Sequence, residues 1–417
     1  MPGGSFQRAR PACKKRSPLQ GIDTDVPLLP QEVSTDMCCC FLYSYIGLEK
    51  PQLTCGQKNP ATNTRPDQRQ YGMNDMMDNF RNGLGIRDVS TYAGVRSVLM
   101  DDGLMRAMQI RYIKLHFELE MLEDGMLPRT KASMLRGGMG RMLLMMNCIR
   151  DEECDLCDFK EECIVPRMMY ARMKIRPSFM TQKDSEGYVL ECEDSEEAFM
   201  AGDSLFFNLI LFGDSIVYFN QFLQAFHALG QQGLGAGHIR FRIRRITNTT
   251  RDLLLEGATF YKENYMILRI RDYVSYRLRS LGEGQDILLV FHSPLTLKYQ
   301  GSLQNSLDPL PLLSAIERRL YILNCYEGLR DGDDYSRISV QEHVPRKIDE
   351  RIYLERVKRY SGTQDRKIVF SGIRGSCRLS RLDHTAMALL AAGELIHIGK
   401  NTSFGFGRYT LTSKSGR

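Results

Sequence analysis

The chain has 417 residues, 43% hydrophobic and 25% charged, a composition typical of a globular protein of two or three domains. Its net charge of +6 comes from 56 cationic and 50 acidic side chains. A charge this small is compatible with nucleic-acid binding but does not by itself indicate it. No apolar run approaches a membrane span of ~18 residues, and the N-terminus lacks the apolar segment of a signal peptide. We therefore expect a cytoplasmic protein with no membrane partner.

The N-terminal region, residues 1–105, predicts a poorly ordered extension. Its first 30 residues are rich in Pro, Gly and basic side chains, and residues 56–90 are polar with little periodicity. The first strong pattern begins at residue 109. A natural start at Met105 or Met108 is an alternative explanation for this contrast.

The first structured half begins with a strand at residues 109–122, because β-forming residues alternate there. Helical spacing of Met and Leu predicts a helix over residues 133–148. A hairpin is expected over 168–191, turning at 184–187. A buried strand follows at 203–212 and an amphipathic helix at 215–229.

Four cysteines follow the first predicted helix, with the spacing Cys148-x5-Cys154-x2-Cys157-x5-Cys163. Four thiolates so close in sequence can surround one tetrahedral zinc ion, and the central C-x2-C supplies a tight turn. A [4Fe–4S] cluster takes the same ligands, and four free cysteines in a surface loop are the third alternative. A zinc site closed by four thiolates would be structural, since no coordination position stays open for a substrate.

A glycine loop, GQQGLGAG at residues 230–237, leads into a predicted strand over 238–244. Arg240, Arg242 and Arg244 recur at period 2 and would share one face of that strand. They form either a positive stripe for a nucleic acid or a solvated sheet face.

The second half repeats this order of elements. A strand is expected at 287–297 and a helix at 310–326. Further strands are expected at 336–344 and 367–379, and 351–359 is either a strand or a helix. A helical run at 383–394 comes before the last strand, at 408–412.

A second glycine loop, residues 395–409, lies between that last helix and strand. It contains Gly399, Gly405 and Gly407 together with Lys400 and Arg408. Glycines let a backbone approach a ligand closely, and successive amides with nearby cations can hold a phosphate. The alternative is a tight helix-to-strand turn.

Two halves of order β-α-β-β-α-β, each with a helix–glycine loop–strand ending, predict an α+β protein with tandem ferredoxin-like (RRM-like) domains. We expect the first at residues 106–275, with a Cys-rich insertion at 148–163, and the second at 280–417.

The motifs of both halves resemble the RAMP superfamily of CRISPR-associated proteins, and specifically its pre-crRNA-processing endoribonuclease. The family's C-terminal glycine-rich loop is similar to G-K-x-T-x-F-G-F-G-x-Y at Gly399–Tyr409. LRGGMGRMLL at 135–144, the Cys cluster, GQQGLGAG and FHSPLTL at 291–297 resemble one branch. Arg359-Tyr360-Ser361 matches an R-Y-S element, but its usual continuation is replaced by Gly362-Thr363-Gln364. The resemblance covers residues 108–412.

The resemblance implies cleavage of CRISPR precursor RNA within its repeats, without a catalytic metal. The 2′-OH would attack the adjacent phosphate and leave a 2′,3′-cyclic phosphate and a 5′-OH. Precursor RNA and its repeat hairpin are the implied partners. The alternative is a non-catalytic RAMP subunit that binds crRNA and acts as a scaffold in an interference complex.

The expected catalytic residues adjoin the two glycine loops. Histidine suits general acid–base work near neutral pH, so His397 and His227 are the first candidates, although both could equally be helix caps. Lys400 and Tyr409 are secondary candidates. The expected RNA-binding residues are Gly233, Gly235, Gly237, Arg240, Arg242, Arg244, Gly399, Gly405, Gly407 and Arg408.

Overall fold

The computed structural model describes residues 102–150, 152–169, 177, 187–282, 286–327, 338–361 and 366–413. All of them belong to one compact unit, which runs from Gln70 to Arg417. The predicted extension lies outside the described residues up to residue 101, and helix α3 begins at Asp102 and ends at Ala107. In the part of the chain that is described, no helix is long and apolar enough to cross a membrane.

The first half contains one β-α-β-β-α-β unit. Its order is β1 (Arg111–Met121), α4 (Lys131–Asn147), β3 (Tyr188–Glu191), β5 (Ser204–Phe212), α6 (Phe219–Gln232) and β6 (Phe241–Thr247). The sheet has the strand order β3-β5-β1-β6, and all these neighbours are antiparallel. This is the ferredoxin-like arrangement that the sequence predicts. Three short strands extend the sheet: β7 (Leu253–Glu256), β8 (Thr259–Phe260) and β9 (Leu268–Arg269).

Alternation along β1 separates a core face from a polar face. Leu115, Phe117 and Leu119 point towards the helices and are buried, and Phe117 stacks on Phe207 with 4.6 Å between ring centroids. Phe226 of α6 completes this aromatic cluster, 4.8 Å from Phe207. Burial of each such side chain contributes about 1.5–3 kcal/mol. The polar face carries the charged residues discussed below.

The second half repeats the unit and the topology. Its order is β10 (Ile287–Leu295), α8 (Pro309–Glu327), β13 (Arg346–Ser361), β14 (Arg366–Ser380), α9 (His384–Ile396) and β15 (Tyr409–Ser413). The sheet order is β13-β14-β10-β15, again antiparallel throughout. The prediction of tandem ferredoxin-like folds is thereby confirmed. The domain boundaries at 275 and 280 stay a prediction.

Two local predictions are wrong. Residues 340–343 form a short 3₁₀ helix (Val340–His343) instead of a strand, because an apolar–polar alternation this short also fits one helical turn. Ile164–Met169 forms helix α5, so the expected hairpin does not begin at Met168. Its predicted turn at 184–186 lies outside the described residues, whereas the strand at Tyr188 is confirmed.

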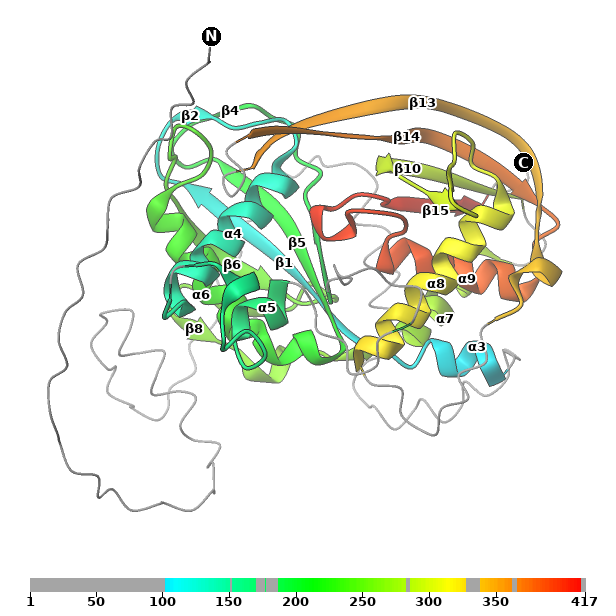
Figure 1. Cartoon of the computed structure of the whole chain (residues 1–417), viewed down its shortest axis with the longest axis horizontal. Helices are drawn as coiled ribbons and strands as arrows, with labels where there is room; N and C mark the ends of the chain where they lie inside the picture. The colour runs from blue at the N-terminus through cyan, green and yellow to red at the C-terminus, as the bar shows by residue number, and fades with distance from the viewer. Residues whose placement is uncertain are drawn as a thin grey trace, which may run out of the picture. The chain divides into compact units, whose positions relative to one another are not determined.

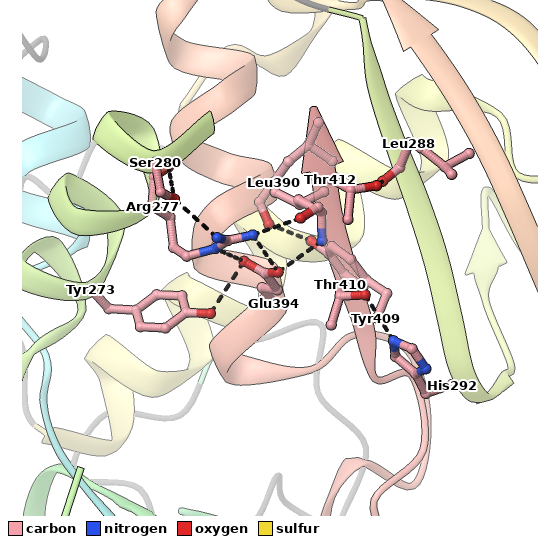
Figure 2. A network of polar contacts seen from close by, with 11 residues as sticks. Tyr273, Arg277, Ser280, Leu288, His292, Leu390, Glu394, Tyr409, Thr410 and Thr412 are labelled. Atoms are coloured by element: carbon pink, nitrogen blue, oxygen red, sulfur yellow. Dashed lines mark hydrogen bonds and ion pairs between the residues drawn. The ribbon is translucent and has the colours of Figure 1, made fainter. Parts of the chain in front are cut away.

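Helix α7 (Ile270–Leu281) joins the second half through a buried ion pair, shown in Figure 2. Arg277 lies 2.6 and 3.0 Å from the two carboxylate oxygens of Glu394 on α9. Its guanidinium also donates to the carbonyl of Leu411 at 2.7 Å, and Tyr273 donates to Glu394 at 3.2 Å. The two buried charges therefore satisfy each other and have further hydrogen bonds, which offsets the cost of burying them.

The hairpin of β13 and β14 extends beyond its own sheet. Strand β10 pairs with β14 from Leu379 to Ile373, whereas β13 and β14 continue together to Ser361 and Arg366. Figure 1 shows this hairpin reaching from the second half towards α4 of the first. It therefore connects the region of the C-terminal glycine loop with the first half.

Candidate functional site

The C-terminal glycine loop is a tightly packed turn in which the glycines are required by geometry. Gly399, Gly405 and Gly407 have φ angles of 83°, 79° and 69°, which disfavour other residues. A Cβ on Gly407 would overlap the carbonyl of Ile398, and one on Gly405 would lie 2.6 Å from the carbonyl of Leu190. The loop is thereby packed directly against β3 of the first half.

Backbone amides of this loop donate hydrogen bonds to carbonyl groups of the protein itself. Those of Phe404 and Gly405 donate to Asn401 and Thr402 at 3.0 and 2.9 Å, and those of Lys400 and Gly407 donate to Thr296 and Pro294 at 3.0 Å. A phosphate cradle needs amides that point at the ligand. For these four groups the geometry favours the tight turn over the cradle.

His397 lies at the C-terminal end of α9 and is completely buried. Its Nε2 is 2.9 Å from Oε1 of Glu191 on β3, and its Nδ1 is 3.2 Å from the carbonyl of Phe406. Both ring nitrogens therefore face protein acceptors, and neither is accessible to a substrate. The contact instead links the two halves of the chain.

Glu191 is the centre of a buried cluster of charges. Lys114 lies 2.9 Å from its Oε2, Asn208 donates to it at 2.8 Å, and Arg408 lies 3.5 Å from its Oε1. Burial by itself would raise the pKa of Glu191, but the cations of Lys114 and Arg408 outweigh it and hold the pKa well below its ordinary value. The carboxylate is thus ionised and holds the cations in place.

Two further predicted residues also point inwards. Arg408 is paired with Glu191 and with Glu193. Tyr409 is 1% exposed, and its hydroxyl donates to the carbonyl of Leu390 at 2.6 Å. By contrast, Lys400 is exposed at the turn. Of the predicted cations in this loop, Lys400 is the one that a ligand can reach.

Three elements meet at the outer side of the glycine loop, and we name this place the loop–hairpin junction. The guanidinium of Arg136 on α4 lies 4.3 Å from the ring of Phe404. On the other side, Phe370 of β14 lies 5.8 Å from Phe404 and 5.4 Å from Phe406. Opposite Phe370, Val357 of β13 is buried. The junction comprises Arg136, Phe404, Phe406, Phe370 and the adjoining β13 residues Arg356, Val357 and Lys358.

Cations border this junction. Arg356 and Lys358 flank Val357 along β13 and are both exposed, whereas Arg136 is half-buried. Because side chains alternate along a strand, Arg356 and Lys358 point to the face of the hairpin opposite Val357 and Phe370, and the rings of Phe404 and Phe406 are buried. The exposed cations can therefore contact RNA phosphates, while the aromatic rings pack the hairpin onto the glycine loop. These residues were not predicted from the sequence as binding residues. The signal was available in the glycine-rich start of α4 and in the Phe-Gly-Phe of the loop.

The other predicted catalytic residue, His227, lies on α6 and is exposed. It lines a shallow pocket of about 220 Å³ together with Gln231, Arg240 and Arg242. Its Nε2 is 3.3 Å from the amide nitrogen of Gln231. The structure therefore brings together His227 and two of the predicted RNA-binding arginines.

The arginine stripe is opposed by a row of carboxylates. Arg242 lies 2.9 Å from Glu120, and Arg244 lies 3.3 Å from Glu118, both on the neighbouring strand β1. Arg240 donates to Glu123 at 2.7 Å. The pairs of Arg240 and Arg242 are exposed and therefore weak, whereas the carboxylate of Glu118 is buried. The stripe is thus a charge-balanced sheet face.

The first glycine loop is also a tight turn. Gly233 and Gly235 have φ angles of 90° and 69°, and a Cβ on Gly233 would overlap the backbone of His238. Gly237, the third predicted glycine, is exposed. The loop returns the chain from α6 into β6, beside the pocket of His227.

His116 belongs to the polar face of the first sheet and is 7% exposed. Its Nδ1 is 2.6 Å from Oδ1 of Asn208. Burial, reinforced by the charges of Arg251 and Lys114, lowers the pKa of His116 to about 3. The imidazole is therefore neutral in the folded protein.

The four cysteines of the predicted metal site line one pocket at the end of α4. Their thiols form no disulfide. Among the described residues, no group of three or more His, Cys, Asp or Glu is arranged to hold a metal ion as it stands.

Comparison with protein families gives two matches. Residues 289–409 match the family described as CRISPR-associated endoribonuclease Cas6. Residues 110–268 match AF_1859_N, described as an N-terminal domain. The first match spans the chain from β10 to β15 and confirms the resemblance to the RAMP-type endoribonucleases for that part. Among curated proteins there is no match.

Several solved structures are similar to this chain at low identity. A chain of a partial Cas6-RT-Cas1–Cas2 complex is 11% identical with a TM-score of 0.48, over 74% of this chain and 47% of that one. A Cas6 product complex is 17% identical with a TM-score of 0.41, over 73% and 100%. Thermus thermophilus Cas6 is 12% identical with a TM-score of 0.40, over 72% and 98%. This chain spans about half the length of the first. The fold assignment rests on the strand order of the two sheets.

Proposed function

We propose that this chain is a repeat-specific endoribonuclease that cleaves CRISPR precursor RNA to release crRNA. The observation that carries the proposal is the match of residues 289–409 to the Cas6 endoribonuclease family. That match begins and ends within the second ferredoxin-like unit and includes the whole C-terminal glycine loop.

The reaction proposed is metal-independent. A base removes the proton of the 2′-OH, the 2′-oxygen attacks the adjacent phosphorus, and the bond to the 5′-oxygen breaks. An acid protonates the leaving 5′-oxygen, so the products end in a 2′,3′-cyclic phosphate and a 5′-OH. Cations near the phosphate stabilise the additional negative charge of the transition state.

RNA binds, in this proposal, at the loop–hairpin junction. Arg356 and Lys358 are exposed on the hairpin, and Lys400 is exposed on the glycine loop. Phe404 and Phe370 support this surface from below. The repeat hairpin supplies the phosphates, so affinity decreases steeply as salt is added.

We assign the catalytic roles to the predicted residues that a substrate can reach. His227 is exposed in a pocket with Arg240 and Arg242, which makes it the candidate for general acid–base work. Lys400 is the candidate for charge stabilisation. His397 and Tyr409 are positioning residues, since both are buried and hydrogen-bonded to the protein.

One observation favours a second function, a crRNA-binding scaffold without catalysis. Two of the four predicted catalytic side chains, His397 and Tyr409, have no access to substrate. The same junction could then hold the end of a crRNA in an interference complex.

The test is incubation of the purified chain with repeat RNA in excess EDTA. The endoribonuclease predicts a single cut within the repeat, whereas the scaffold predicts salt-dependent binding without cleavage. His227→Gln and Lys400→Ala should then each lower the single-turnover cleavage rate by at least about tenfold while RNA is still bound. Lys298→Ala, which removes another exposed lysine, is the matched control and should cleave normally. Full activity in both variants would reject the assignment of these two residues.

A further inference from the structure

The segment from Cys148 to Cys163, which joins α4 to α5, has no hydrophobic core of its own. Of its described residues, the four cysteines are half-buried and all the others are exposed. Even its large apolar side chains face the solvent: Ile149, Leu156 and Phe159 are 79%, 77% and 50% exposed. Hydrophobic burial therefore does not explain how this segment is held.

The four thiols share the one inward-facing side of the segment. Cys148, Cys154, Cys157 and Cys163 line a single pocket of about 230 Å³. Cys148 comes from the end of α4 and Cys163 directly precedes α5. Between them, a 3₁₀ turn over Cys154–Leu156 brings the central pair together, and the amide of Cys157 donates to the carbonyl of Cys154 at 3.4 Å.

We propose that this pocket binds one zinc ion through the four cysteine thiolates. Zinc takes four sulfur ligands in a tetrahedron, and structural sites commonly include a C-x2-C turn of this kind. The four groups must still move together, because they do not form a ligand set as they stand. No buried side chain of the described segment opposes that movement.

The surroundings suit the charge of such a site. Zinc with four thiolates carries a net charge of −2, and Arg150 and Lys160 line the pocket to offset it, although Glu153 and Glu162 line the same pocket. Binding releases the thiol protons as the zinc–sulfur bonds form, so affinity falls at low pH. The ion has no open position for a substrate, and its role is to stabilise the fold.

The structure also indicates what the ion would stabilise. Helix α5 follows directly after Cys163, and its Val165 and Met168 are buried in the core of the first half. A zinc site would anchor α5 to the end of α4 and so stabilise that side of the first half. Because this role is structural, the proposal does not depend on the RNA-cleaving function.

Elemental analysis of the full chain, purified under reducing conditions without chelator, tests the proposal. We expect one zinc ion per chain. If cobalt replaces zinc, absorption bands in the near ultraviolet and visible should report tetrahedral thiolate ligation. A preparation with no zinc that also fails to bind added zinc would overturn the proposal. A brown protein containing iron and sulfide would overturn the identity of the metal.

Variants separate these cysteines from the others. Cys154→Ser with Cys157→Ser should abolish stoichiometric zinc and lower the thermal midpoint of the protein. Cys192→Ser is the matched control, because Cys192 is also half-buried but its Sγ lies 3.4 Å from the carbonyl of Phe206, away from this pocket. Zinc retained by the double variant, or lost by the control, would contradict the ligand set. If the double variant does not fold, the cobalt spectrum of the wild-type chain still shows whether thiolates bind the metal.

Discussion

Removal of the Glu191 carboxylate should be among the most damaging single changes to stability. The side chain is 2% exposed and is contacted by Lys114, Asn208, His397 and Arg408. Glu191→Ala would leave the cation of Lys114 without this partner in a mostly buried site. Breaking a buried ion pair on one side costs about 3–5 kcal/mol, a large part of a typical total stability of about 5–15 kcal/mol.

Urea unfolding followed by circular dichroism measures this change. Glu123→Ala is the matched control, because Glu123 also pairs with an arginine, Arg240, but does so at the surface. We expect the Glu191 variant to unfold at a clearly lower urea concentration and the control to unfold like the wild type. If the two variants were equally stable, the buried cluster would not hold the halves together as we infer.

Three further predictions concern other parts of the chain. The lowered pKa of His116 means that the unfolded state binds the extra proton, so stability is present above pH 6.5 and is lost as the pH falls towards 3. Urea unfolding should show a loss of about 1.4 kcal/mol from this residue between pH 7.5 and 5.5, and an unchanged pH dependence in His116→Gln would contradict it. Gly407→Ala should lower the thermal midpoint far more than Gly257→Ala, because both have positive φ but a Cβ finds open space only at Gly257; equal midpoints would refute the packing argument. Arg356→Ala with Lys358→Ala should make RNA binding less sensitive to salt, because each cation that no longer neutralises a phosphate lowers the slope of log affinity against log salt by about 1. Fluorescence anisotropy across a salt series measures that slope, and an unchanged value would place the RNA elsewhere.

The order of the elements in both halves was predictable from the sequence because the spacing of apolar residues within each element indicates a strand or a helix. Alternation in β1 and helical spacing in α6 each follow from which face meets the core. The hairpin of β13 and β14 was harder to predict, since much of its length lies beyond the sheet and few of its described side chains there are buried. Residue 340 begins a single helical turn, too short for periodicity to identify.

The candidate site was predictable only in outline. Arg242 and Arg244 lie on β6 as predicted, whereas Arg240 comes directly before the strand. The opposing carboxylates became visible only with the register between β1 and β6, which pairs residues more than 100 positions apart. The partner of His397 is likewise Glu191, 206 residues away. Proximity to a glycine loop suggested an accessible base, whereas the loop closes over His397 because its glycines allow such tight packing.

The proposed cleavage depends on attack by the 2′-OH, and a repeat RNA with one 2′-deoxy nucleotide immediately upstream of the cut tests this step. In EDTA, we expect the unmodified repeat to be cut to products with a 2′,3′-cyclic phosphate and a 5′-OH. The 2′-deoxy repeat should bind with the same affinity and remain intact. Cleavage of the 2′-deoxy repeat at the same position, or no cleavage of either RNA, would contradict it.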